Sequence, residues 1–127
     1  MSFRLSTRSR SRLVGVNPAL IAIVESAIEK TSVDFMITEG VRSAERQAVL
    51  VKAGASRTNK SRHLTGHAVD VAAIVDGQVR WDWPLYGRIA AAFKEAASEL
   101  KTPIIWGGDW KTLRDGPHFE LDRRVFP

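Results

Sequence analysis

SRHLTGHAVD, residues 61–70, leads from a polar loop into the strand on which the fold is built. The small and β-branched residues that follow predict a strand over residues 68–75. Side chains alternate between the two faces of a strand, so Asp70 shares its face with Ala68 and Ala72. The other face carries Val69, Val71 and Ala73. A carboxylate in such a strand is costly unless it is paired or binds a metal ion, and the two alanines leave room for an ion and a substrate.

A second segment, DGPHFE at residues 115–120, predicts a final strand over residues 118–121. His118 and Glu120 would then share one face, opposite Phe119 and Leu121. If the two strands are neighbours, one face collects two imidazoles and a carboxylate, from His63, Asp70 and His118. Such a set gives a zinc ion three ligands and leaves one position open, as in catalytic sites.

Two further residues of these segments have open roles. Asp115 lies three residues before His118, across a Gly-Pro turn, and is placed to accept a proton from water. His67 is a weaker alternative third ligand, because strand alternation turns it away from Asp70. The competing interpretation is structural, since isolated histidines usually fill the surface or the core, and spacing alone does not decide between the two.

The other elements are predicted from local signals. Asn17-Pro18, Ser43 and Asp82-Trp83-Pro84 mark helix starts, and Asp76-Gly77 marks a hairpin turn. Helices are expected over residues 18–31, 44–53 and 84–100, and the remaining strands over 34–38, 78–81 and 104–106. The sequence therefore predicts one α+β domain, with three helices on a small, largely antiparallel sheet. We expect this domain to span residues 13–127, after a basic and partly mobile arm at residues 1–12.

Composition excludes several classes of protein. The chain has 127 residues and no cysteine, which excludes disulfides, a thiol nucleophile and thiolate zinc sites. No apolar stretch approaches the ~20 residues that span a bilayer. The apolar stretch from Leu13 to Val24 is interrupted by Asn17-Pro18 and has no clear cleavage site, so no signal peptide is expected.

The net charge of +5 is concentrated in two blocks. Residues 1–12 contribute four arginines and no acid, and residues 52–62 contribute Lys52, Arg57, Lys60 and Arg62. The rest of the chain holds 11 basic and 14 acidic residues, a balance of −3. The two blocks predict attraction to anionic polymers. Nucleic acid is not the expected partner, because the aromatic residues gather around the predicted zinc cleft rather than among the cations.

The pattern S-x-H-x-x-G-x-A-x-D, followed by D-x-P-H-F-E, resembles the zinc D-Ala-D-Ala and L-Ala-D-Glu peptidases of bacterial cell walls, the M15-type family. This family shares its fold with the amino-terminal domain of hedgehog proteins. Residues 35–43 with Gln47 resemble the family's G-x-R-S…Q element, and residues 106–110 the segment before its second motif. Chain length is similar to that of the small single-domain endolysins of tailed phages.

The resemblance assigns roles to individual residues. It implies one zinc ion on His63, Asp70 and His118, with Asp115 as the catalytic carboxylate. Arg42 would face the scissile carbonyl or a substrate carboxylate, although a structural ion pair with Glu39 or Glu45 is the alternative. Substrate contacts are expected from Ser61, Gln47 and Trp110. Three questions stay open: whether Trp106 and Trp110 line the cleft or the core, whether Glu120 orients a histidine ligand, and what His67 does.

The resemblance implies a zinc-dependent peptidoglycan peptidase, an endolysin that hydrolyses the L-alanyl-D-glutamate bond and lyses the host. A D-Ala-D-Ala carboxypeptidase or dipeptidase of the same family is the alternative, and a catalytically silent binding module is a more distant one. It implies a monomer made in the host cytoplasm that reaches the wall after the membrane is permeabilised. The segment between Trp110 and His118 offers only Asp115 as a carboxylate anchor, so no calcium loop is expected.

Overall fold

A five-stranded antiparallel sheet forms the centre of the computed structural model, which describes residues 2–55 and 61–127. The strands run in the order β1-β2-β5-β4, with β3 paired to β2. Their bounds are β1 Asp34–Glu39, β2 Ala68–Val75, β3 Gln78–Arg80, β4 Ile104–Trp106 and β5 His118–Leu121. The predicted α+β class is confirmed, and each predicted strand agrees with the structure to within one residue at either end.

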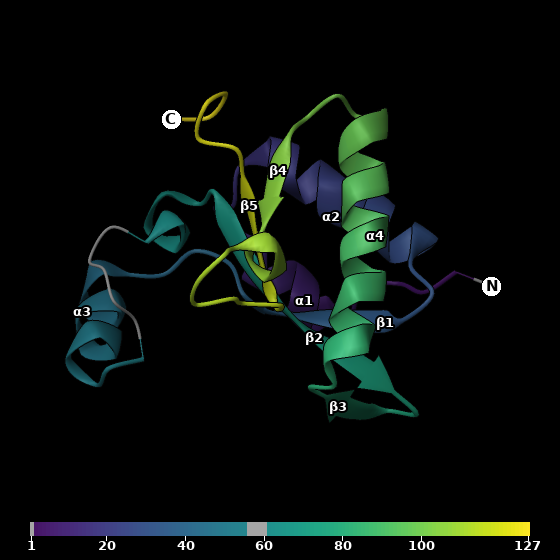
Figure 1. The fold of residues 1–127 in the computed structure, drawn as a ribbon, viewed down its shortest axis with the longest axis horizontal. Coiled ribbons are helices and arrows are strands. Elements are labelled where there is room, and N and C mark those ends of the chain that lie inside the picture. The colour runs from purple at the N-terminus through teal and green to yellow at the C-terminus, as the bar shows by residue number, and fades with distance from the viewer. Residues whose placement is uncertain (1, 56–60) are drawn as a thin grey trace.

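Three longer helices accompany the sheet, as the sequence predicts. They are α2 Pro18–Lys30, α3 Ala44–Lys52 and α4 Trp83–Glu99. Helices α2 and α4 pack against each other on one side of the sheet, whereas α3 lies at the opposite end of the molecule (Figure 1). Two short 3-10 turns, η1 Arg62–Thr65 and η2 Gly107–Asp109, occupy segments expected to be loops. Within residues 2–55 and 61–127, every helix is too short or too polar to cross a bilayer.

The core lies between the sheet and the pair α2 and α4. Val69 and Val71 of β2 and Phe119 of β5 are fully buried there, and the Phe119 ring stacks on Phe93 of α4 with the centroids 3.9 Å apart. Asp70 pairs with His118, and both side chains lie on the other face. The predicted alternation is therefore confirmed, and it separates an apolar face from a polar one.

Two of the three predicted helix caps form. The Asn17 side chain accepts a hydrogen bond from the backbone N–H of Ala19 at 2.9 Å, and the Ser43 side chain accepts one from Arg46 at 3.1 Å. Asp82 makes no such bond, because its carboxylate pairs with Arg80 at 2.8 Å instead.

The N-terminal segment differs from the arm predicted for residues 1–12. Residues 7–12 form helix α1, Thr7–Arg12, which packs on β1. The buried hydroxyl of Ser9 accepts a hydrogen bond from Ile37 N–H at 3.0 Å, and Arg12 donates to the Ile37 carbonyl at 2.9 Å. No apolar stripe in the sequence predicts this helix, because polar side chains join it to the sheet.

Candidate functional site

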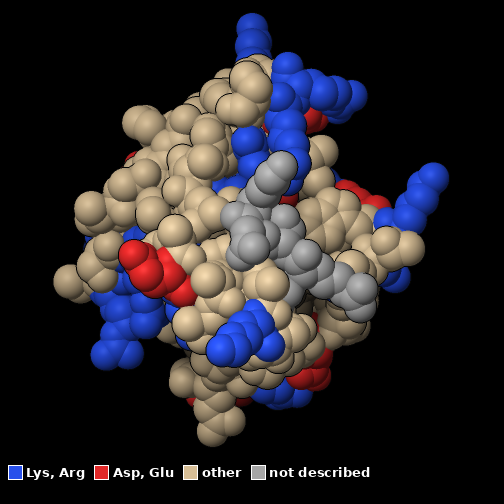
Figure 2. Space-filling view, turned by 90° about the vertical axis from the view of Figure 1, so that its left-hand side faces the viewer, with Lys and Arg blue, Asp and Glu red and all other residues tan. Residues whose placement is uncertain are grey.

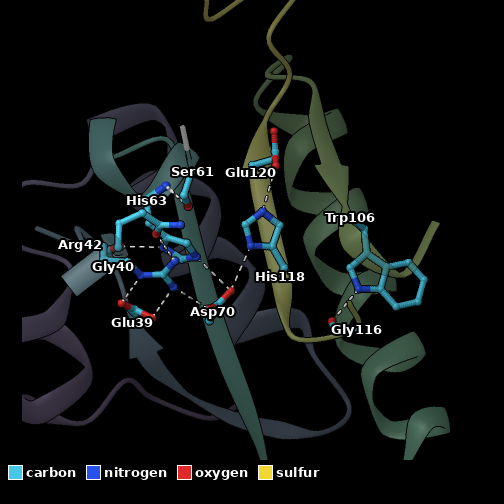
Figure 3. Close-up of polar contacts among 11 residues, drawn as sticks. Glu39, Gly40, Arg42, Ser61, His63, Asp70, Trp106, Gly116, His118 and Glu120 are labelled. Carbon is cyan, nitrogen blue, oxygen red and sulfur yellow. Dashed lines mark hydrogen bonds and ion pairs between the residues drawn. The ribbon is translucent and has the colours of Figure 1, made fainter. Parts of the chain in front are cut away.

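His63, Asp70 and His118 converge on the polar face of the sheet (Figure 3). Asp70 and His118 lie directly opposite each other on β2 and β5, and η1 brings His63 beside them. Asp70 Oδ1 is 3.2 Å from His63 Nε2 and 3.1 Å from His118 Nδ1. One potential ligand atom from each residue lies within 4.8 Å of the other two. The predicted convergence is confirmed.

We call His63, Asp70 and His118 the metal group. Each of its two imidazoles is held through the nitrogen that points away from Asp70. His63 Nδ1 is 2.8 Å from the carbonyl oxygen of Gly40, and His118 Nε2 is 2.9 Å from Glu120 Oε1. Because both acceptors lack a hydrogen, each of these nitrogens donates. A neutral ring then keeps its lone pair on the nitrogen that faces Asp70. This is the arrangement in which histidine ligands are oriented by their outer partners.

Burial and charge at the metal group fit a divalent metal ion. His63 is 2% exposed, and its Nε2 makes no hydrogen bond although Asp70 is near. Burial raises the pKa of Asp70, but the hydrogen bond from His118 and the close approach of the His63 imidazole outweigh it and hold that pKa well below its ordinary value. Burial lowers the pKa of His118, but its bonds to Asp70 and Glu120 raise it to about 9. A bound metal ion would replace the proton on His118 Nδ1. It would also give His63 Nε2, which has no hydrogen-bond partner in the described part of the chain, a partner.

Arg42 is held beside the metal group by two side chains. Its Nε and Nη2 donate to the two carboxylate oxygens of Glu39, both at 2.6 Å, and Nη1 donates to Gln47 Oε1 at 2.7 Å. Nη2 also lies 3.8 Å from Asp70 Oδ2. The ion pair with Glu39 is thus present, and Arg42 still lines the cavity. Gln47 is 1% exposed and lies behind Arg42, so the structure does not place it at the cavity surface, where a substrate contact was predicted.

Asp115 reaches the same cavity from the loop before β5. Its N–H donates to the Gly107 carbonyl at 3.0 Å, and its own carbonyl accepts from His118 N–H at 3.2 Å. Burial raises the pKa of its carboxyl group, and the charge of Asp70 raises it further. The group is therefore a stronger base than an ordinary aspartate, and it is fixed to the first residue of β5.

Gly107 makes this position of Asp115 possible. A Cβ atom at Gly107 would lie 2.3 Å from the Asp115 carbonyl oxygen, a distance that real Cβ atoms essentially never show. The residue pattern of 106–110 indicated only a family resemblance and did not reveal this contact. The signal available in the sequence was a glycine pair shortly before a candidate catalytic carboxylate.

The two tryptophans beside the site have different surroundings. Trp106 is buried, stacks on Phe119 and donates from Nε1 to the Gly116 carbonyl at 2.7 Å, so it belongs to the core. Trp110 lines the cavity, with its ring 5.2 Å from that of His118. The alternatives left open by the sequence therefore have different answers for the two residues.

The remaining predicted residues surround the metal group. Ser61 lines the cavity, and its hydroxyl accepts a hydrogen bond from His63 N–H at 3.2 Å. His67 pairs through Nδ1 with the Thr65 hydroxyl at 2.6 Å and is not part of the metal group. Glu120, whose role the sequence left open, is 6% exposed and holds His118.

The cavity above the metal group has a volume of about 630 Å³. Polar and charged side chains line it together with apolar ones, including Leu50 and Leu113. Further arginines line it, namely Arg46, Arg62 and Arg123. The cavity thus brings together a candidate metal group, a candidate base and a fixed cation, the parts that a metal-dependent hydrolase needs.

Comparison with known proteins names the family. Fold and site define a metallopeptidase, and the chain belongs to the family described as phage L-alanyl-D-glutamate peptidase, which it matches over residues 1–126. It is 32% identical over 130 residues to the L-alanyl-D-glutamate peptidase of Escherichia phage T5, covering 99% of this chain and 94% of that protein. The corresponding protein of Listeria phage A118 is 35% identical over 98 residues, which are 77% of this chain and 34% of that protein.

A solved structure extends this likeness to the whole fold. The L-Ala D-Glu endopeptidase ChiX of Serratia marcescens is 47% identical and superposes with a TM-score of 0.93. The match covers 98% of this chain and 94% of ChiX. The family resemblance found in the motifs is therefore confirmed across the chain.

Proposed function

We propose that this protein is a zinc-dependent endopeptidase that cleaves the L-alanyl-D-glutamate bond of bacterial peptidoglycan. The observation that carries the proposal is the metal group lying in one cavity with Asp115 and Arg42. The named activity of its family and of ChiX supports the same bond.

The metal group would hold one zinc ion. Two imidazole nitrogens and one carboxylate oxygen are ligands that zinc accepts, and they leave a coordination position open. Zinc bound there would supply a Lewis acid that polarises the peptide carbonyl and acidifies water. Gly40 and Glu120 would keep the two imidazoles oriented for it.

Asp115 is the proposed general base and acid. Its carboxylate accepts the proton of the attacking water and then delivers a proton to the leaving amine of D-glutamate. Partial burial and the charge of Asp70 raise the pKa of Asp115, which brings the group closer to neutral pH and improves both transfers.

Arg42 is the proposed partner of the oxyanion that develops on the scissile carbonyl. Glu39 already occupies the Nε–Nη2 edge of the guanidinium, so a substrate carboxylate cannot take that edge in a bidentate pair. The remaining N–H groups can still donate into the cavity that Arg42 lines. A cation held before the reaction begins stabilises developing negative charge at little reorganisation cost.

The substrate surface and the route to the wall complete the proposal. Ser61 and Trp110 line the cavity and would contact the stem peptide. We infer a monomer whose catalytic domain includes helix α1 as well as the predicted residues 13–127, made in the host cytoplasm and acting on the wall after the membrane is permeabilised. Named relatives from phages support this site of action.

Attraction to anionic envelope polymers is also part of the proposal. On the face shown in Figure 2, basic side chains occur at several separate places among uncharged surface. Arg62 is buried and Arg12 binds the β1 backbone, so the two contribute less to surface attraction than their charge suggests. Arg57 and Lys60 lie outside the described residues. Lysis of whole walls should weaken as the Debye length falls below ~8 Å, and a rate independent of salt would contradict this part.

Digestion of purified peptidoglycan, followed by mass spectrometry of the fragments, tests the main proposal. New amino-terminal D-Glu together with free L-Ala ends is expected, and a chelator should abolish their appearance until zinc is restored. Release of D-Ala alone would instead support the D-Ala-D-Ala carboxypeptidase. Metal analysis of protein purified without chelator should give one equivalent of zinc.

A further inference from the structure

Arg62, the residue before His63, is a buried cation that the proposed reaction does not use. It is 9% exposed, and charged side chains are rarely buried without a partner. One of its nitrogens, Nη2, donates to the carbonyl of Phe126 at 2.6 Å and lies 3.2 Å from that of Leu121. These bonds hold the guanidinium against the backbone of the C-terminal segment. Neutral carbonyl groups, however, do not balance its charge.

Glu120 supplies the opposite charge. Arg62 Nε lies 3.8 Å from Glu120 Oε2 and has no hydrogen-bond partner among the described residues. Arg123 also approaches this oxygen, with its Nε at 3.6 Å, but its side chain is 66% exposed and its attraction is screened by water. Arg62 is therefore the partner that stays in place in the interior.

The other carboxylate oxygen of Glu120 holds a metal ligand. Oε1 accepts the hydrogen bond from His118 Nε2 at 2.9 Å, and the far side of the ring places Nδ1 3.1 Å from Asp70 (Figure 3). A line of contacts thus runs from Arg62 through Glu120 to the nitrogen that faces the metal group. His63, by contrast, is held by a main-chain carbonyl, which a side-chain substitution cannot remove.

We propose that Arg62 is a positioning residue for the metal centre: it holds the Glu120 carboxylate in place, so that His118 donates from Nε2 and presents Nδ1 as a ligand. This inference rests on the proposed metal centre and adds a residue that never contacts the ion. Without the buried cation, Glu120 can turn toward Arg123 and solvent, and His118 loses the acceptor that selects its tautomer.

Zinc affinity, measured by competition with a chromogenic chelator, tests the proposal independently of peptidase activity. Arg62→Met keeps an unbranched side chain but removes the guanidinium and its charge, and it should weaken zinc binding by about 10- to 100-fold. Arg62→Lys should recover part of that loss. Arg123→Ala is the matched control at the same Glu120 oxygen and should change affinity by less than about threefold.

Imidazole ¹⁵N shifts of His118 provide a second readout at high pH, where the metal-free ring is neutral. In the parent protein Nε2 should carry the hydrogen, whereas Arg62→Met should give a mixture of tautomers. Folded Arg62→Met protein with parental zinc affinity and parental His118 shifts would overturn the proposal. If Arg62→Met does not fold, Glu120→Leu decides, because it removes the acceptor of His118 Nε2, and parental zinc affinity in that variant equally overturns the proposal. Failure of the proposed peptidase activity would leave both readouts intact.

Discussion

The metal group and Asp115, the proposed base, are held in place by different kinds of contact. Asp70 and His118 sit at paired positions of neighbouring strands, and each histidine has a second, fixed hydrogen-bond partner. Asp115 lies on a loop and depends on a backbone contact with Gly107. We therefore expect metal binding and proton transfer to be separable by substitution, although both groups face one cavity.

Replacing a ligand should cause the largest loss. His63→Ala removes the buried nitrogen that lacks a hydrogen bond, so both zinc binding and hydrolysis of peptidoglycan should fall below detection. Metal analysis and fragment mass spectrometry on the same sample check this result. His67→Ala is the control. Because His67 lies outside the metal group, this variant should still bind zinc.

Replacing the proposed base should separate the two properties. Asp115→Asn keeps the shape of the side chain and removes its basicity, so the rate should fall by about 10²- to 10⁴-fold with one zinc ion retained. Kinetics on a soluble stem peptide, with zinc analysis, measure both. Loss of the ion in this variant would mean that the loop and the metal group are not independent.

Displacing the base without changing it should have a smaller effect. Gly107→Ala places a Cβ 2.3 Å from the Asp115 carbonyl oxygen and forces the loop to move. A shift of about 1 Å at a reacting group can cost on the order of 10²-fold in rate. The same kinetic assay should show this loss with zinc retained. Gly77→Ala is a poor control because Gly77 has a positive φ, whereas Gly87 in α4 has open space and suits the purpose.

The smallest expected effect is on stability. The folded pKa of Asp115 is raised, mainly by burial, so its ionised form is less favourable in the folded than in the unfolded chain. This cost is absent below the ordinary aspartate pKa and complete above the raised one. Asp115→Asn should therefore raise the Tm of chelator-treated protein by a few degrees at neutral pH, and the gain should shrink as the pH falls toward 4. An equal gain at both pH values would show that the charge is not its cause.

Much of the fold and the metal group followed from short-range patterns. Alternation along residues 68–75 and 118–121 placed Asp70 and His118 on one face, because a strand has a strict period of two. The caps at Asn17 and Ser43 were predictable because each is a hydrogen bond between residues two or three positions apart.

Features made by contacts between distant segments were not predictable in the same way. Helix α1 is joined to the sheet by Ser9, and Arg62 is buried against the carbonyl of Phe126, 64 residues away. Gln47 was expected to contact the substrate. The sequence does not show that Arg42 lies between Gln47 and the cavity. Family motifs identify which residues matter, but the packing decides which of them reach the cavity.

The position of β5 has a consequence for when the protein becomes active. This strand is the last of the five to be made, yet it lies between β2 and β4 and carries His118. A nascent chain that has not yet released β5 has a split sheet, an incomplete ligand set and two unpaired strand edges. The ribosome therefore sets the earliest moment at which the complete ligand set can exist.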